Sequence, residues 1–165
     1  MIPVVSIVGK RNSGKTTLMV KLIAQFQSLG FQVGTIKHDA HDFEMDHPGK
    51  DTYQHFQAGA EQVMIAAAHK IALVRRTAQP LSLDNLVEHY FENVDIILTE
   101  GYKSGSKPKI EVFRSDIHDQ PLCTKADDLI AFVSDVPLAE DVPLFKPHEI
   151  DQIVQFMLHE FGLSR

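Results

Sequence analysis

The hydrophobic residues of this 165-residue chain fall into short apolar runs and into segments with helical spacing. Short apolar runs bounded by polar residues predict strands that are buried in a sheet, and they occupy residues 2–8, 31–37, 61–67, 70–76, 94–99, 108–114 and 129–135. Segments in which apolar residues recur every three or four positions predict helices, which we expect at residues 15–29, 51–59, 82–93 and 148–162. Asp51 and Ser82 are the expected N-caps of the second and third helices.

The order of these elements predicts an α/β fold. A strand, a helix and a second strand follow one another within residues 2–37, and such a βαβ unit builds a parallel sheet. The length is typical of one domain, and the sequence has no internal repeat, low-complexity tract or linker. We therefore expect a three-layer α/β/α arrangement with a mostly parallel sheet, and a single domain over residues 1–165.

The loop between the first strand and the first helix carries a phosphate-binding motif. Its sequence, GKRNSGKT at residues 9–16, satisfies the pattern G-x-x-x-x-G-K-[ST] of P-loop NTPases. The glycines let backbone N–H groups surround a phosphate, and the helix N-terminus adds partial positive charge. We expect Lys15 to reach the β- and γ-phosphates and the Thr16 hydroxyl to ligate Mg²⁺. The nucleotide contacts predicted in this segment are Gly9, Arg11, Asn12, Ser13, Gly14, Lys15, Thr16 and Thr17.

A P-loop site also needs a carboxylate near Mg²⁺, at the carboxyl end of a neighbouring strand. The run at residues 94–99 has Asp95 near its start and Glu100 directly after its end. Because a strand rises ~3.3 Å per residue, Asp95 would lie roughly 16 Å from the site. We therefore predict that Glu100 holds the metal through water and, with Lys15, serves any catalysis. Gly101 would permit a close approach of the backbone to the γ-phosphate.

The second strand also ends beside the phosphate loop, so Lys37 and Asp39 are further candidates for nucleotide contact. The polar stretch that follows, HDAHDFEMDHPGK at residues 38–50, is rich in His and acidic side chains. Imidazole and carboxylate groups suit Zn²⁺ or Ni²⁺. A switch that folds over the phosphates and a solvated polar loop are the other interpretations of the same residues.

The phosphate loop and two later segments resemble the molybdopterin-guanine dinucleotide biosynthesis protein B family (MobB). The later segments read K-H-x-x-H-x-F-x-x-D-x-P-G-K-D-T from Lys37 and D-I-I-L-T-E-G-Y-K from Asp95, and S-D-V-P from Ser134 matches as well. The matching residues of the two segments include Lys37, His38, His41, Phe43, Asp46, Pro48, Gly49, Lys50, Asp51, Thr52, Glu100, Gly101 and Lys103. Tyr102 stands where the family often has Phe.

The resemblance implies a cytoplasmic GTP-binding protein that uses Mg²⁺, hydrolyses GTP slowly at most, and is usually a homodimer. Such proteins assist the guanylyltransferase that attaches GMP to molybdopterin. We expect molybdopterin contacts from residues 38–52, Tyr102 and Lys103. Lys50 and Lys103 are the natural partners for a pterin phosphate.

Two aspartates compete for recognition of the guanine base. Asp127 belongs to T-K-A-D, which matches the [NT]-K-x-D signature of many GTPases, but only a poor strand precedes it. Asp135 follows the convincing apolar run at residues 129–133, which places it at a carboxyl end. We favour Asp135, because a carboxylate there can accept from the guanine N1–H and N2–H and would be left unpaired by adenine.

The net charge and the cysteine content limit the kinds of partner and metal site that we expect. The net charge of −6 argues against a broad nucleic-acid surface, and no run approaches the ~18 apolar residues of a membrane span. We therefore expect neither nucleic acid nor a membrane as a partner. Cys123 is the only cysteine, which excludes an intramolecular disulfide and a multi-cysteine zinc site.

Two other functions remain open. A GTP-dependent metallochaperone of the nickel-insertion type would use the histidines of residues 38–50, although such proteins usually carry a cysteine motif as well. A small-molecule kinase would close arginines over the phosphates, and the five arginines of this chain form no arginine-rich lid. The apolar pair at residues 61–67 and 70–76 could extend a sheet across the subunits of a dimer.

Overall fold

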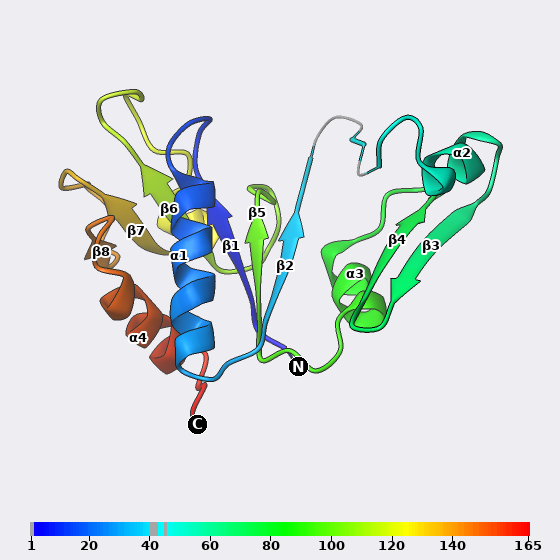
Figure 1. Cartoon of the computed structure of the whole chain (residues 1–165). Coiled ribbons are helices and arrows are strands. Elements are labelled where there is room, and N and C mark those ends of the chain that lie inside the picture. Colours follow the sequence, from blue (N-terminus) through cyan, green and yellow to red (C-terminus); the bar gives the residue numbers. More distant parts are fainter. Residues whose placement is uncertain (1, 40–42, 45) are drawn as a thin grey trace. The chain divides into compact units, whose positions relative to one another are not determined.

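The first apolar run forms an inner strand of a parallel sheet in the computed structural model, which describes residues 2–39, 43–44 and 46–165 (Figure 1). Six strands of the described chain pair in the order β2-β5-β1-β6-β7-β8, and each pair is parallel. Their bounds are β1 Val4–Val8, β2 Val33–Lys37, β5 Ile96–Glu100, β6 Lys109–Phe113, β7 Leu129–Ser134 and β8 Leu144–Phe145. The predicted α/β class with a mostly parallel sheet is confirmed, and all six carboxyl ends face one edge.

Two helices cover one face of this sheet. The helices α1 (Lys15–Ser28) and α4 (Ile150–Glu160) pack against each other, and α1 contacts β1, β2 and β5. Every second residue of the inner strands packs with residues of the two helices in one hydrophobic core. Ile7 of β1 and Leu98 of β5, for example, belong to the same core as Leu22 of α1. This burial is the main stabilising term for the sheet, since each fully buried Leu or Ile contributes about 1.5–3 kcal/mol.

Residues 39–90 form a second compact unit, separate from the unit of residues 1–38 and 91–165. It contains α2 (Asp51–Gln57), the antiparallel pair β3 (Gln62–Ala67) and β4 (Lys70–Arg75), and α3 (Leu83–Tyr90). That all 165 residues act as one nucleotide-binding domain stays a prediction. In the part of the chain described, no helix is both long enough and apolar enough to span a bilayer.

The helix starts of the second unit are partly as predicted. Ser82 accepts a hydrogen bond from the backbone N–H of Asn85 at 3.1 Å, as an N-cap does. The expectation that Asp51 caps α2 is wrong. Lys50 occupies the N-cap position, and Asp51 is the first helical residue. An acidic side chain in the first turn still complements the helix dipole, so the sequence signal was right within one residue.

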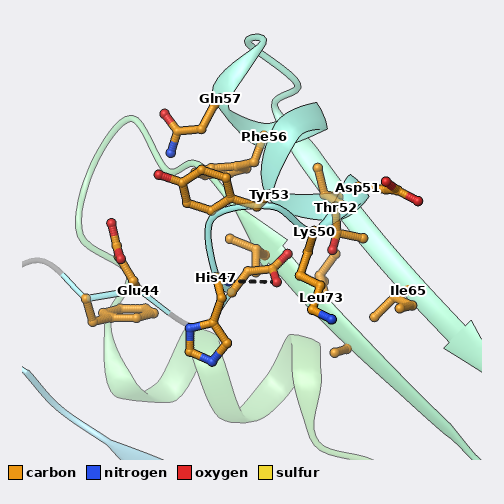
Figure 2. Close-up of a pocket in the computed structure, with 15 residues that line it drawn as sticks. Glu44, His47, Lys50, Asp51, Thr52, Tyr53, Phe56, Gln57, Ile65 and Leu73 are labelled. Carbon is orange, nitrogen blue, oxygen red and sulfur yellow. Dashed lines mark hydrogen bonds between the residues drawn. The ribbon is translucent and has the colours of Figure 1, made fainter.

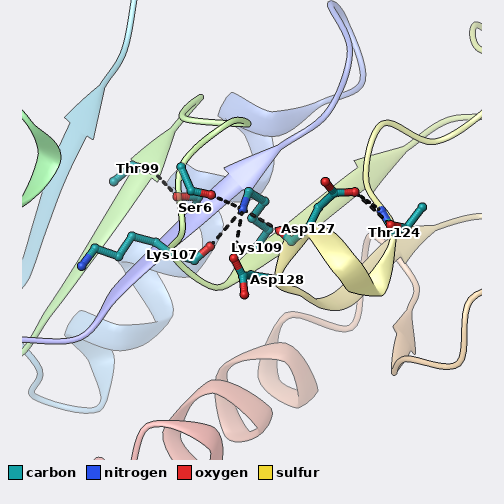
Figure 3. A network of polar contacts seen from close by, with 8 residues as sticks. Ser6, Thr99, Lys107, Lys109, Thr124, Asp127 and Asp128 are labelled. Carbon is teal, nitrogen blue, oxygen red and sulfur yellow. Dashed lines mark hydrogen bonds and ion pairs between the residues drawn. The ribbon is translucent and has the colours of Figure 1, made fainter.

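The strand β6 carries two buried charges on the face away from α1 and α4. The Lys109 ammonium group, whose residue is 1% exposed, donates to the carbonyl oxygens of Gly105 at 2.5 Å, Asp127 at 2.6 Å and Lys107 at 3.3 Å (Figure 3). The Glu111 carboxylate accepts from the backbone N–H groups of Leu122 and Cys123, at 2.7 and 2.8 Å. Burial raises the pKa of Glu111, although these N–H groups oppose the shift.

These two side chains fasten the loops on that face to the sheet. Lys109 joins the β5–β6 connection to the 3₁₀ turn η1 (Lys125–Asp127), and Glu111 holds the segment that leads into η1. A buried carbonyl or N–H group that has lost its partner costs about 1–3 kcal/mol. Lys109 and Glu111 therefore hold the loops at both ends of β6 through hydrogen bonds to backbone groups, in addition to the apolar packing of Cys123 with Val8 and Phe132.

We expect Lys109→Met to lower the free energy of unfolding by about 2–3 kcal/mol, because it leaves part-buried carbonyl oxygens without a donor. Urea denaturation measures the change. Lys125→Met is the matched control, since the Lys125 ammonium also donates to a carbonyl, that of Asp141, but on an exposed surface, where we expect less than about 0.5 kcal/mol. Equal stability of Lys109→Met and wild type would refute the anchoring role.

Candidate nucleotide-binding site

The backbone of the predicted phosphate loop turns repeatedly into the left-handed region. Gly9, Asn12 and Gly14 have φ angles of 147°, 63° and 98°. A Cβ atom at Gly9 would lie 2.5 Å from the carbonyl oxygen of Val112, so a side chain is excluded there. Alternation of left- and right-handed residues turns successive N–H groups toward one point. The loop therefore has the conformation that an anion site needs, directly before the N-terminus of α1.

Thr16 and Glu100, the two predicted metal-binding residues, are in contact. The Thr16 hydroxyl lies 3.1 Å from both carboxylate oxygens of Glu100, which is 84 residues away in sequence. Glu100 is the last residue of β5 and pairs with Ile7 of β1 and Lys37 of β2. The parallel register thus brings the first turn of α1 and the end of β5 together. A hydroxyl beside a carboxylate is an oxygen pair that suits Mg²⁺.

Lys15 lies next to this pair with its ammonium group turned back onto the loop. Its Nζ donates to the carbonyl oxygen of Lys10 at 2.8 Å. Burial lowers the pKa of Lys15, and the negative charge of Glu100 partly opposes the shift. An ammonium group with reduced hydration gains more from a nearby anion than a solvated one does. The environment therefore favours binding of a negatively charged group at this position.

Ser13 independently indicates that the loop has a polar group left for a ligand to bind. Within the described ranges, its hydroxyl is the buried side-chain oxygen that has no hydrogen-bond partner, and the residue is 2% exposed. Leaving a buried hydroxyl unpaired costs about 1–3 kcal/mol. Such a cost fits a loop whose polar groups gain partners when a phosphate binds.

The other predicted residues of the loop are exposed. Arg11, Asn12 and Thr17 all present their side chains to solvent. The carbonyl oxygen of Arg11 lies 2.9 Å from Nε2 of His118, which belongs to the segment after β6. His118 supports the loop from a neighbouring segment, and no motif in the sequence pointed to it, because the two residues are 107 positions apart.

The segment after Glu100 bends back onto the end of β2. Gly101 has a φ of 103°, and a Cβ atom there would lie 3.2 Å from the Cβ of His38. The ring of Tyr102 packs on the ring of His38, with centroids 4.7 Å apart. Gly101 therefore makes a close backbone approach to His38, whereas its predicted approach to a γ-phosphate stays a prediction. Lys37 and Asp39 are both exposed at this strand end.

The two candidate base-recognition residues lie at opposite ends of β7. Asp135 directly follows β7 and is exposed, and its carbonyl oxygen accepts from Lys146 Nζ at 2.9 Å. Asp127 precedes β7, and its Oδ2 accepts from both the backbone N–H and the hydroxyl of Thr124, each at 2.9 Å. These hydrogen bonds lower the pKa of Asp127. Since the phosphate loop follows the carboxyl end of β1, the geometry favours Asp135.

The polar stretch at residues 38–50 is described only in part. His41, an expected family match, lies outside the described residues. Nowhere in the described chain do three or more His, Cys, Asp or Glu side chains form a group able to hold a metal ion. Asp46 accepts from the backbone N–H of His47 at 2.9 Å, and hydrogen bonds from Thr52 and His47 lower the pKa of Asp46.

A pocket of about 570 Å³ opens within residues 39–90 (Figure 2). Tyr53 and Phe56 of α2 line it, together with Val63 and Ile65 of β3. Lys50 adds a cationic group to the lining, as predicted for a pterin-phosphate partner, but no contact of the structure tests that role. The pocket combines aromatic, aliphatic and charged groups, a composition typical of small-molecule sites.

Comparisons with known proteins agree with these features. Residues 4–135 match the family model described as molybdopterin guanine dinucleotide synthesis protein B. The chain is 36% identical over 162 residues to the molybdopterin-guanine dinucleotide biosynthesis adapter protein of Escherichia coli K12, covering 96% of this chain and 93% of that protein. It is 35% identical over 168 residues to the protein of the same name from Haemophilus influenzae, covering 99% and 94%.

A solved structure has the same fold. The crystal structure of Bacillus subtilis MobB superimposes with a TM-score of 0.74 at 28% sequence identity. The superposition covers 96% of this chain and 98% of that one. Both units of the chain are therefore included in the match.

We expect Lys15→Ala to weaken binding of a nucleoside triphosphate by about 2–3 kcal/mol, or roughly 30- to 150-fold, because a charge-assisted contact is lost. Equilibrium titration measures the affinity. Lys21→Ala removes an exposed lysine from the same helix and should bind as wild type does. Wild-type affinity in Lys15→Ala would remove Lys15 from the site.

Proposed function

The chain belongs to the molybdopterin guanine dinucleotide synthesis protein B family, and from this we propose that it is a GTP-binding adapter in formation of the guanine dinucleotide form of the molybdenum cofactor. Its role in this biosynthesis follows from the family and from the named relatives. The proposal beyond the family is that GTP with Mg²⁺ occupies the phosphate loop and controls the adapter. The contact between Thr16 and Glu100 beside that loop is the observation that carries it.

The residues of the loop fit a Mg²⁺-bound triphosphate. The backbone N–H groups of residues 9–16 would bind the phosphate oxygens, and Lys15 would give up its hydrogen bond to the Lys10 carbonyl to reach them. Thr16 would hold the metal directly, and Glu100 would hold it through water. When bound, Mg²⁺ would neutralise charge on the phosphates. Lys37 and Gly101 would line the γ-phosphate end, and a nucleotide contact of Asp39 stays a prediction.

We assign slow hydrolysis at most. In this proposal Lys15 would act on the γ-phosphate by its charge and Glu100 by orienting water. Gating by nucleotide needs only that the bound and empty loops differ in affinity for a partner. Hydrolysis is therefore a means of resetting the adapter rather than its chemical task.

The partners that we assign are the molybdenum cofactor guanylyltransferase and molybdopterin. The pocket of residues 39–90 supports a pterin site, because Tyr53 and Phe56 can stack on a planar ring and Lys50 can bind its phosphate. Contacts of Tyr102 and Lys103 with molybdopterin stay predictions. We place the protein in the cytoplasm, where this biosynthesis would occur.

A homodimer is supported by the exposed apolar side chains of β3 and β4. Met64 and Ile71, which lie on the same face of the hairpin, are 51% and 67% exposed. Large apolar side chains grouped on a short hairpin favour burial against a second surface. The metallochaperone and kinase alternatives gain no comparable support from the described residues.

We expect the guanylyltransferase to bind this protein more tightly when GTP and Mg²⁺ are present. An adapter controlled by its nucleotide must have different partner affinities in its bound and empty states. Analytical ultracentrifugation or surface immobilisation of the guanylyltransferase can measure the affinity with GTP, with ATP and without nucleotide.

The variants Lys15→Ala and Lys21→Ala supply the controls. Lys15→Ala should bind the partner equally with and without GTP, whereas Lys21→Ala should respond as wild type does. Partner affinity that is unchanged by GTP in the wild type would contradict the proposed control.

A further inference from the structure

Lys146 directly follows strand β8, at the edge of the sheet where we expect the guanine base to bind. β8 pairs in parallel with β7, and Val133 lies beside Phe145. The next residue, Lys146, therefore emerges at the carboxyl edge, close to Asp135. Its Nζ donates to the Asp135 carbonyl oxygen at 2.9 Å. An ammonium group and a carboxylate-bearing residue thus share the edge of the sheet at which the phosphate loop also lies.

The backbone at Lys146 is itself held in place. Its N–H donates to the Glu149 carboxylate at 2.6 Å, just before α4 begins. Lys146 is half-buried, and its ammonium group is held by a carbonyl oxygen in this contact rather than by a carboxylate. A carbonyl leaves the positive charge largely uncompensated, so the group can still donate to another acceptor.

Guanine has an edge that matches these two groups. Its N1–H and N2–H are donors, and its O6 is an acceptor. A carboxylate satisfies the first two, and an ammonium group satisfies the third. Adenine has an N6–H₂ donor in place of O6 and an acceptor at N1, so both charges would meet groups of the wrong kind.

We propose that Lys146 determines base specificity by donating to O6 of guanine while Asp135 accepts from N1–H and N2–H. This assignment rests on the proposed GTP binding. Lys146 would leave the Asp135 carbonyl, or share its donors with it, when the base enters. The sequence contained no signal for it, because the strand that positions it has two residues.

Another lysine near a base candidate, Lys125, lacks this placement. It lies on η1, which precedes β7, and its Nζ donates to the Asp141 carbonyl at 3.3 Å. Lys125 is therefore a matched control for Lys146, because its ammonium group also donates to a backbone carbonyl but precedes β7 instead of following β8.

The test compares GTP, 6-thio-GTP and ITP by equilibrium titration in wild type, Lys146→Met and Lys125→Met. 6-Thio-GTP retains N1–H and N2–H but replaces O6 with sulfur, a weak acceptor, whereas ITP retains O6 and lacks the N2 amino group. Wild type should prefer GTP over 6-thio-GTP by roughly tenfold, as expected when a charge-assisted hydrogen bond is weakened.

In Lys146→Met we expect GTP affinity to fall about tenfold or more and the preference over 6-thio-GTP to shrink to within about twofold. The ratio of GTP to ITP affinities should stay as in wild type, because it reports on Asp135. Lys146→Arg should restore part of the O6 preference, and Lys125→Met should behave as wild type.

The outcomes separate the two proposals. If wild type binds no GTP, the proposed function fails, and this assignment fails with it. If GTP binds and Lys146→Met keeps the wild-type preference for O6, only the assignment of Lys146 is overturned. An equal loss of affinity for all three nucleotides would also overturn it, since that result reports disturbance of the loop rather than contact with O6.

Discussion

The parallel alignment of β1, β2 and β5 is the constraint on which the site depends. It sets Glu100 level with Ile7 and Lys37, so the carboxylate meets the first turn of α1 at Thr16. A shift of one residue in the β5 register would turn this side chain to the other face of the sheet. The buried core under α1 and α4 keeps the register, and the chemistry of the loop follows from it.

The face of the sheet away from α1 and α4 carries two buried charges in addition to a small apolar cluster that includes Val8, Cys123 and Phe132. Lys109 and Glu111 are buried and satisfied mainly by backbone groups of the surrounding loops. These contacts fix the segments on either side of β6, whereas Lys146 connects the ends of β7 and β8.

Local patterns predicted the parts of this molecule that depend on neighbours in sequence. The βαβ unit, the conformation of the phosphate loop and the position of Glu100 at a strand end all follow from runs and motifs of a few residues. The two-residue strand β8 has too few positions to show a period. The hydrogen bonds from Lys109 and Lys146 to backbone carbonyls could not be predicted in this way, because they depend on which loops the fold brings together. The motif at Asp127 resembles a base-recognition signature, but the Asp127 carboxylate is bound to Thr124 at the far end of β7, and the choice of Asp135 for the base stays a prediction.

The end of β5 and the start of α1 are the proposed site for Mg²⁺-bound GTP. Calorimetric titration of GTP into wild type and Glu100→Gln, with and without Mg²⁺, tests it most directly. We predict that Mg²⁺ increases the affinity of the wild type for GTP, and that this increase is about tenfold smaller in Glu100→Gln. Without Mg²⁺, the affinity of Glu100→Gln for GTP should equal or exceed that of the wild type, because a negative charge near the phosphates has been removed. An equal gain from Mg²⁺ in both proteins would contradict the account.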